Sequence, residues 1–223
     1  MTPAVLVPGM LCDADLWSGV ELPDTVHAEI TAPTVTGMAE QVLAAVDGPF
    51  TLIGLSLGAI VGFEVLRLAP ERVTALCAIS TNAAAPTPQQ LAGWRSMDER
   101  TATGGFEAVI RDDILPTMFA EPGHDDRFWG MARRIGPDTF RAQLAAQATR
   151  TDAFGVLASA SCRVLTVCGS DDALCPVAFH RRIAEAVPDR RARLRILPGA
   201  GHLLPIERPR VLAGLLNEWL NDK

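Results

Sequence analysis

Residues 50–58 have the sequence FTLIGLSLG, in which a short apolar run, Phe50–Ile53, passes into a longer one, Leu57–Leu68. The first run is typical of a buried β-strand, and the second is long enough for a helix. Ser56 lies between them, with glycines two positions before it and two positions after it. A serine at such a strand–turn–helix junction is forced out of the regular backbone and exposes its hydroxyl above the sheet edge. The segment therefore predicts a nucleophilic serine beside a helix N-terminus, whose free N–H groups can stabilise an oxyanion.

Short β-type runs alternate with helical patterns along the rest of the chain. The expected strands are Ala4–Val7, Val26–Ile30, Phe50–Ile53, Val73–Ser80, Arg163–Cys168 and Leu194–Leu197. The expected helices between them are Gly37–Val46, Leu57–Ala69, Pro176–Val187 and Glu207–Leu220. This alternation predicts an α/β fold with a mainly parallel sheet of about six strands and helices on both faces. Such sheets bind ligands beyond the carboxyl ends of their strands, where Ser56 lies.

Residues 83–155 contain no convincing strand and only helical patterns. The expected helices there are Gln89–Arg100, Gly105–Asp113, Asp125–Arg134 and Pro137–Arg150. An insertion of this length after a strand end predicts a helical cap, with residues 1–82 and 156–223 as the core of one domain. Several cap side chains are candidates for an apolar substrate pocket, although each of them could instead pack within the cap. They are Trp94, Met118, Phe119, His124, Phe128 and Trp129.

A serine nucleophile needs a base, and the chain offers four histidines. His202 lies in the glycine-rich stretch PGAGHL, residues 198–203, directly after the last expected strand. Such a loop can carry an imidazole over the sheet edge. His27 falls in a strand pattern, His124 in the cap and His180 in a helix, where a packed or solvated histidine is the simpler interpretation.

The imidazole in turn needs a carboxylate that fixes its tautomer and stabilises its charged form. The segment GSDDALCP, residues 169–176, follows an expected strand and offers both Asp171 and Asp172. With either of them, the chain order is serine, aspartate, histidine.

Four motifs, spread over nearly the whole chain, resemble those of the α/β-hydrolase superfamily in its compact, capped form. They are VPGM at 7–10, GLSLG at 54–58, GSDD with Pro176 at 169–176, and Gly201-His202 followed by Glu207 and Pro209. The resemblance implies a triad of Ser56, Asp172 and His202, because the acid in relatives is commonly the fourth residue of G-x-x-D-x-x-x-P. It also implies an oxyanion hole formed by the backbone N–H groups of Met10 and Leu57.

The chain departs from the family's pattern in its first loop. Pro8 stands where relatives often carry a histidine that holds the oxyanion loop in place. The chain also begins at the strand before that loop, so we expect a sheet that lacks the family's first two strands. The side chains of Met10, Leu11 and Leu57 are then expected to form the floor of an apolar acyl pocket.

Composition narrows the classes of function. The chain has 223 residues, of which 48% are apolar, and a net charge of −6, which suits one sizeable core. Its basic cluster, Arg190–Arg195, is interpreted as a solvated turn and strand edge, so nucleic-acid binding is not expected. No basic-then-apolar leader and no long apolar run are present in the sequence, so a cytoplasmic protein without membrane association is expected.

Cofactors and metals are not expected, because no ligand cluster has metal spacing and the glycine-rich loops lack phosphate-binding spacing. The five cysteines form no C-x-x-C pair and predict reduced thiols in the core. Cys12 and Cys175 lie near expected site residues, so a reactive thiol is the less favoured alternative there.

The resemblance implies a serine hydrolase of a small or medium, largely apolar carboxylic ester, lactone or thioester, with an acyl-Ser56 intermediate. His202 is expected to act as base and then acid, and Asp172 to orient it. The same fold hosts cyclases, lyases, C–C bond hydrolases, acyltransferases and perhydrolases, and these remain alternatives. A non-catalytic ligand-binding module is less favoured, because it has no evident need of a base and an orienting acid.

Overall fold

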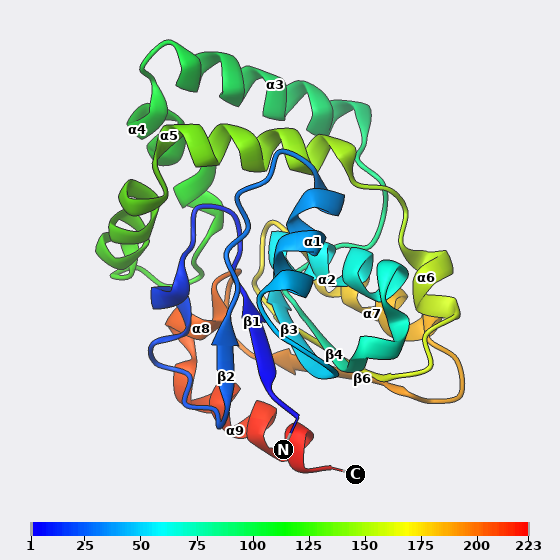
Figure 1. Ribbon diagram of the computed structural model, residues 1–223. Helices are drawn as coiled ribbons and strands as arrows, with labels where there is room; N and C mark the ends of the chain where they lie inside the picture. Colours follow the sequence, from blue (N-terminus) through cyan, green and yellow to red (C-terminus); the bar gives the residue numbers. More distant parts are fainter. Residues whose placement is uncertain (1, 223) are drawn as a thin grey trace.

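The computed structural model describes residues 2–222 and contains one six-stranded sheet (Figure 1). The strands are β1 (Ala4–Val7), β2 (Thr25–His27), β3 (Phe50–Leu55), β4 (Val73–Ile79), β5 (Arg163–Gly169) and β6 (Ala192–Leu197). They lie in the order β2-β1-β3-β4-β5-β6, and every neighbouring pair is parallel. The predicted α/β fold with a parallel six-stranded sheet is confirmed.

Apolar side chains of the strands alternate between two cores, one on each face of the sheet. In β1, Ala4 and Leu6 belong to one core, and Val5 and Val7 belong to the other. The second core packs against α1 (Val35–Ala44), α2 (Leu57–Leu68) and α7 (Val177–Ala186). The first packs against η1 (Ala14–Trp17), α8 (Leu204–Glu207) and α9 (Pro209–Asn221). The sheet is therefore covered on both faces, as the alternation of strands and helices predicts.

The connection from β4 to β5 is helical over most of its length, and we call residues 83–155 the helical segment. It contains α3 (Pro88–Ala102), α4 (Phe106–Val109), a π-turn η3 (Ile110–Ile114), η4 (Leu115–Thr117) and α5 (Asp125–Thr149), and it runs into α6 (Phe154–Ala158). Helices α3 and α5 lie side by side across the end of the molecule at which the strands finish (Figure 1). The two helices predicted over 125–150 form one element with a kink at Gly136, where φ is 75° and ψ is 169°.

Two boundaries differ from the sequence prediction for identifiable reasons. Strand β2 ends at His27 rather than Ile30, because the chain turns away and the Ile30 carbonyl accepts a hydrogen bond from Gln143 of α5 at 3.2 Å. The last predicted helix is divided into α8 and α9 at Arg208, which precedes Pro209 and has a non-helical φ of −136°. A residue before proline is disfavoured in the helical region.

The strand order reverses beside β1, because β2 lies on one side of it and β3 lies on the other. The connections that follow β1 and β3 leave the sheet in opposite directions there. In open parallel sheets this switch point opens a crevice at the carboxyl ends of the strands, where ligands bind. Met10 follows β1 and Ser56 follows β3, so the topology brings both to this crevice.

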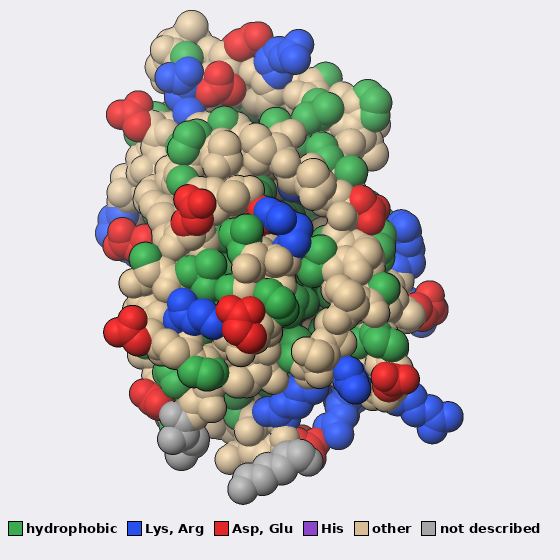
Figure 2. Space-filling model, turned by 45° about the vertical axis from the view of Figure 1, so that its right-hand side comes forward, with side chains coloured by type: hydrophobic (Ala, Val, Ile, Leu, Met, Phe, Trp, Pro, Cys, Tyr) green, Lys and Arg blue, Asp and Glu red, His purple; other side chains and the backbone are tan. Residues whose placement is uncertain are grey.

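The basic cluster lies beside and within the edge strand β6. Arg191 pairs with Asp189 at 3.7 Å, and Arg193 pairs with Asp222 after α9. Figure 2 shows acidic and basic side chains interspersed over one face, with basic ones gathered along its lower part. No helix within residues 2–222 combines the length and the apolar character needed to cross a membrane.

Candidate active site

Ser56 occupies a strained turn between β3 and α2. Its φ of 53° and ψ of −112° lie in a region that residues other than glycine rarely adopt. Its backbone is tied on both sides: the Ser56 N–H donates to the Ile79 carbonyl at 2.8 Å, and the Thr81 hydroxyl donates to the Ser56 carbonyl at 3.0 Å. A backbone outlier fixed by its surroundings is typical of functional sites.

The glycines on either side of Ser56 are required by close backbone contacts. A Cβ atom at Gly54 would lie 2.5 Å from the Gly58 carbonyl oxygen. One at Gly58 would collide with the Val7 carbonyl and lie 2.5 Å from the Pro8 oxygen. The first turn of α2 therefore packs directly against both the serine strand and the loop after β1.

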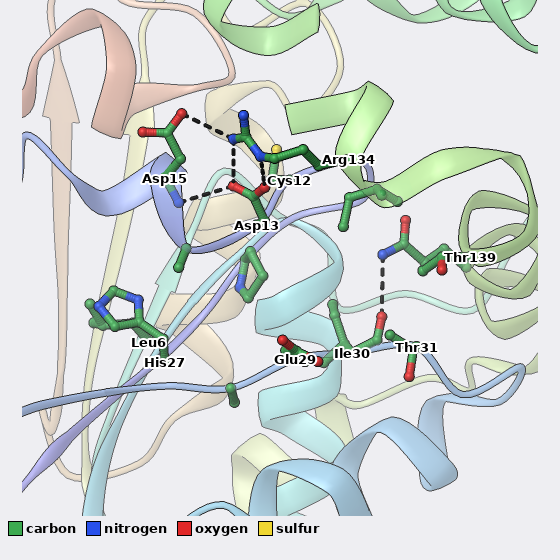
Figure 3. A pocket seen from close by; sticks show the side chains of 15 residues that line it. Leu6, Cys12, Asp13, Asp15, His27, Glu29, Ile30, Thr31, Arg134 and Thr139 are labelled. Atoms are coloured by element: carbon green, nitrogen blue, oxygen red, sulfur yellow. Dashed lines mark hydrogen bonds and ion pairs between the residues drawn. The ribbon is translucent and has the colours of Figure 1, made fainter. Parts of the chain in front are cut away.

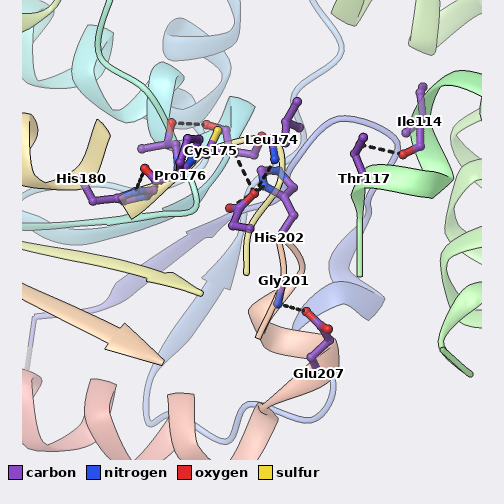
Figure 4. A network of polar contacts seen from close by, with 12 residues as sticks. Ile114, Thr117, Leu174, Cys175, Pro176, His180, Gly201, His202 and Glu207 are labelled. Carbon is purple, nitrogen blue, oxygen red and sulfur yellow. Dashed lines mark hydrogen bonds and ion pairs between the residues drawn. The ribbon is translucent and has the colours of Figure 1, made fainter. Parts of the chain in front are cut away.

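His202 and Asp172 form a buried hydrogen-bonded pair at the ends of β6 and β5. The His202 Nδ1 lies 3.0 Å from Asp172 Oδ2, and the two residues are 2% and 4% exposed. Asp172 Oδ1 also accepts the N–H groups of Leu174 at 2.9 Å and Cys175 at 2.8 Å. Figure 4 shows this network, in which His202 points toward the loop of Leu174 and Cys175. Asp171 is exposed and bonds to its neighbour Ser170 instead.

The surroundings of Asp172 favour its ionised form. Burial raises its pKa, but hydrogen bonds from His202 and from two backbone N–H groups outweigh burial and leave the pKa below 3.8. Because a carboxylate only accepts hydrogen bonds, the His202 Nδ1 carries the proton, and Nε2 remains available as a base. Within residues 2–222, no hydrogen bond joins the Ser56 hydroxyl to His202; such contacts often tighten only when substrate binds.

The loop after β1 forms a tight turn closed by the Cys12 N–H, which donates to the Gly9 carbonyl at 3.1 Å. Leu11 has a φ of 62° in this turn, a conformation usually left to glycine or asparagine. The Leu11 N–H donates to Gln143 Oε1 at 2.9 Å, and Gln143 Nε2 donates in turn to the Ile30 carbonyl. Figure 3 shows the second of these bonds, which ends at Ile30.

Gln143 lies on α5 and is only 1% exposed. It therefore supplies, from the helical segment, a tether for the loop in which Pro8 replaces the usual histidine. The neighbouring Met10 N–H and the Leu57 N–H find no acceptor among residues 2–222. An unpaired donor in the loop after β1 and another at the first residue of α2 fit the expected oxyanion hole.

A cavity of about 390 Å³ contains Ser56 and Met10 and extends beneath the helical segment. Of the predicted pocket residues, it is lined by Trp94 and Met118. The prediction of Leu11 as a pocket residue is corrected, because Leu11 is fully buried in the first core.

The remaining pocket candidates lie away from this cavity. Phe119 stacks against His124, with ring centroids 5.3 Å apart, and against Phe128 at 6.3 Å. Trp129 packs under Arg133 at 5.2 Å. For these residues, packing within the helical segment is the better description, because the cavity lining does not include them.

A second, larger hollow of about 810 Å³ lies behind the loop after β1 and does not contain Ser56 (Figure 3). Its one arginine is already paired with two carboxylates, because Arg134 lies 2.6 Å from Asp13 and 3.2 Å from Asp15. Volume alone therefore does not identify the reaction site.

Asp172, Cys175 and His202 place their ligand-type atoms within 4.8 Å of one another. The Asp172 carboxylate is hydrogen-bonded to His202 Nδ1 and to the N–H groups of Leu174 and Cys175, as expected of an acid that orients a base. Burial raises the pKa of the Cys175 thiol well above its usual value and also raises that of Cys12. Neither thiol therefore has the character of a nucleophile.

Sequence reasoning missed the part played by His180 of α7. Its Nε2 accepts the Thr81 N–H at 2.9 Å, and its Nδ1 lies 3.4 Å from the Pro176 carbonyl. Burial lowers the pKa of His180 to about 4, so the ring is neutral at physiological pH. Through Thr81, which bonds to the Ser56 carbonyl, His180 supports the serine turn. No local sequence signal connects residues 81 and 180.

Comparison with known proteins agrees with this architecture. Residues 4–215 match the model of the alpha/beta hydrolase family. The chain belongs to this family. Among curated relatives of this hydrolase, a pimeloyl-[acyl-carrier protein] methyl ester esterase of Neisseria meningitidis serogroup B is 24% identical, with 91% of this chain and 81% of the relative covered.

Solved structures extend the likeness to the whole hydrolase. A thermophilic esterase from Thermogutta terrifontis superposes with a TM-score of 0.87 at 25% identity, covering 99% of this chain and 89% of the esterase. An enol-lactonase from Burkholderia xenovorans also gives a TM-score of 0.87, at 17% identity, covering 100% and 92% of the two chains. The second likeness concerns the fold alone, whereas the first adds an esterase to the relatives of this hydrolase.

Proposed function

We propose that this α/β hydrolase is a serine hydrolase that cleaves a small or medium carboxylic ester, lactone or thioester through an acyl-Ser56 intermediate. The observation that supports this most strongly is the buried His202–Asp172 pair, joined at 3.0 Å. It lies at the same end of the sheet as a serine held at a φ of 53°. A base, an acid that orients it and an exposed hydroxyl are the three parts of a serine triad.

In the proposed reaction the Ser56 Oγ attacks the acyl carbonyl and gives its proton to His202 Nε2. Ionised Asp172 stabilises the imidazolium that forms. The N–H groups of Met10 and Leu57 donate to the developing oxyanion. His202 then protonates the leaving group, and a water molecule, activated by the same imidazole, releases the acid and regenerates the serine.

The lining of the cavity supports an acyl chain with a substantial apolar part. Met10, Trp94, Met97, Ile114 and Met118 all contribute to it. Its volume of about 390 Å³ lies near the lower end of the range for small-molecule sites, which favours substrates of modest size.

The test combines covalent labelling with turnover. We expect a fluorophosphonate to add one phosphonyl group to Ser56, seen by intact-mass measurement, and p-nitrophenyl esters of C2 to C12 acids to be hydrolysed. Ser56→Ala should abolish labelling and lower kcat by at least about 10⁴-fold, whereas Ser159→Ala, on a turn after α6, should change neither.

Other outcomes separate the alternatives. Labelling without ester turnover would indicate a cyclase, lyase or acyl-transfer chemistry that uses the same serine. Absence of labelling would contradict an assembled triad and support a ligand-binding module.

A further inference from the structure

Arg150 directly follows α5, whose last residue is Thr149, and its side chain lines the cavity that contains Ser56. Only 7% of the residue is exposed, which is unusual for an arginine. Residues 83–155 thus contribute a buried cation to the proposed reaction site.

No carboxylate among residues 2–222 lies within 4.0 Å of the Arg150 guanidinium. Its contacts are neutral: Nη1 donates to Gln147 Oε1 and Nη2 to Gln90 Oε1, both at 3.1 Å. The guanidinium also lies over the Trp94 ring, 5.2 Å from its centroid. The buried Nε has no hydrogen-bond partner in the described part of the chain.

A buried guanidinium without a counter-ion is energetically unfavourable, because an arginine side chain stays protonated and loses its hydration. Burial lowers the pKa of Arg150, which reflects this cost. Amide oxygens and an aromatic face offset part of it, but they bring no negative charge. The other charged group in the lining, Asp113, is already paired with Arg100 at 2.5 Å.

Arg141, on α5, is an arginine with only a structural role and serves as a comparison for Arg150. It joins α5 to α3 through Asp98 at 2.7 Å, and both side chains are substantially exposed. Arg150 also contacts α3, but it faces the cavity and has no acid to pair with. Packing of the two helices therefore does not require its charge.

We propose that the physiological substrate is an ester that carries a carboxylate away from its reacting carbonyl, and that Arg150 binds this carboxylate. The inference rests on the proposed function and narrows its substrate class. A carboxylate can accept two parallel N–H groups from a guanidinium and would supply the charge that the cavity lacks. The chain between the two ends of such a substrate would lie along the apolar lining near Trp94 and Met97.

The experiment compares matched substrates that differ only in charge. On the acyl side these are p-nitrophenyl half-esters of glutaric and adipic acid, each beside the analogue with a terminal primary amide. On the alcohol side, the acetyl ester of 4-hydroxybutanoate is compared with that of 4-hydroxybutanamide by pH-stat. We expect kcat/KM about 10- to 100-fold higher for the carboxylate member on one of the two sides.

Variants assign that preference to Arg150. Arg150→Met should remove the preference, because kcat/KM should fall at least about tenfold more for the carboxylate substrates than for the amide substrates, and Arg150→Lys should keep part of the preference. Arg141→Met is the matched control on the same helix and should keep the preference in full. Thermal unfolding of each variant reports any loss of packing.

Two results would overturn the inference while ester hydrolysis itself stands: equal kcat/KM for charged and amide substrates in the wild type, or an equal loss for both in Arg150→Met. If no ester is hydrolysed, the proposed function fails, and calorimetric titration of Ser56→Ala with the glutaric half-ester tests the anion site alone. The double variant with Ser56→Ala and Arg150→Met should bind the half-ester at least about tenfold more weakly than Ser56→Ala alone. Equal binding by the two proteins would refute the anion site at Arg150.

Discussion

The loops at the strand ends and helix α5 contribute to the candidate site in different ways. Ser56, Asp172 and His202 follow β3, β5 and β6, and their backbones are fixed by the sheet. Gln143 and Arg150 reach the site from α5, within the segment that connects β4 to β5. In the proposed reaction the first group holds the reacting atoms, whereas the second supports the loop after β1 and, in the proposed substrate complex, supplies a charge. On these proposals, reaction type and substrate choice are carried by separable parts of the chain.

The largest expected effect tests the strand-end group. Asp172→Asn should lower kcat about 10⁴-fold at pH 7, because an amide no longer holds His202 in the tautomer with a free Nε2. Steady-state hydrolysis of a p-nitrophenyl ester measures this. Asp171→Asn, at the exposed neighbouring position, should keep kcat within about twofold of the wild-type value. A comparable loss of kcat in Asp171→Asn would show that Asp172 has been wrongly identified as the acid of the triad.

A second prediction concerns the support beneath the serine. Neutral His180 is favoured in the fold, where its pKa is about 4, against 6.5 for the unfolded chain. Protons bind the unfolded state preferentially between these values, so the free energy of unfolding should fall by roughly 3 kcal/mol as pH drops from 7 to 4. Urea unfolding at several pH values measures this slope.

His180→Gln can still accept the Thr81 N–H but does not titrate, so its stability should be flatter over the same range. His27→Gln, at an exposed position, should keep the wild-type slope. An unchanged slope in His180→Gln would show that another group causes the acid sensitivity.

The smallest of these effects tests α5. Gln143→Leu removes the acceptor of the Leu11 N–H, and kcat should fall about 10- to 100-fold with KM nearly constant, since loss of a whole oxyanion donor costs 10² to 10³. Thr139→Ala, on the same helix beside the hollow behind the loop, should leave kcat unchanged. If KM rises and kcat is unchanged, Gln143 acts on substrate binding. Its proposed role as a support of the oxyanion loop would then be wrong.

The strands that carry the first region were predicted well because their sequence signals are local. Gly54 and Gly58 lie where the backbone of neighbouring segments leaves no room for a side chain. In the segment GSDD, the register of the family pattern selects Asp172, which contacts His202. Strand ends were predicted to within a few residues, and the largest error is β2, which ends early because its continuation bonds to α5.

The second region could not be predicted, because its contacts join residues far apart in the chain. Leu11 and Gln143 are separated by 132 positions, and Arg150 and its partner Gln90 on α3 by 60. Arg150 looks like any surface arginine until its neighbours are known. The aromatic residues of the segment do not share one role: Trp94 lines the cavity, whereas Phe119 and Trp129 pack within the segment. Polar Gln147 and Arg150, which the sequence did not single out, also line the cavity.

Gln143 lies within the last turns of α5, and Arg150 directly follows the helix, seven positions later. Seven residues of α-helix advance about 10.5 Å, close to two full turns, so both side chains share one face. Removing a single residue between them would rotate one against the other by about 100° and separate loop support from charge recognition. When helical segments are exchanged between relatives to alter substrate choice, the seven-residue spacing of these two positions should therefore be preserved.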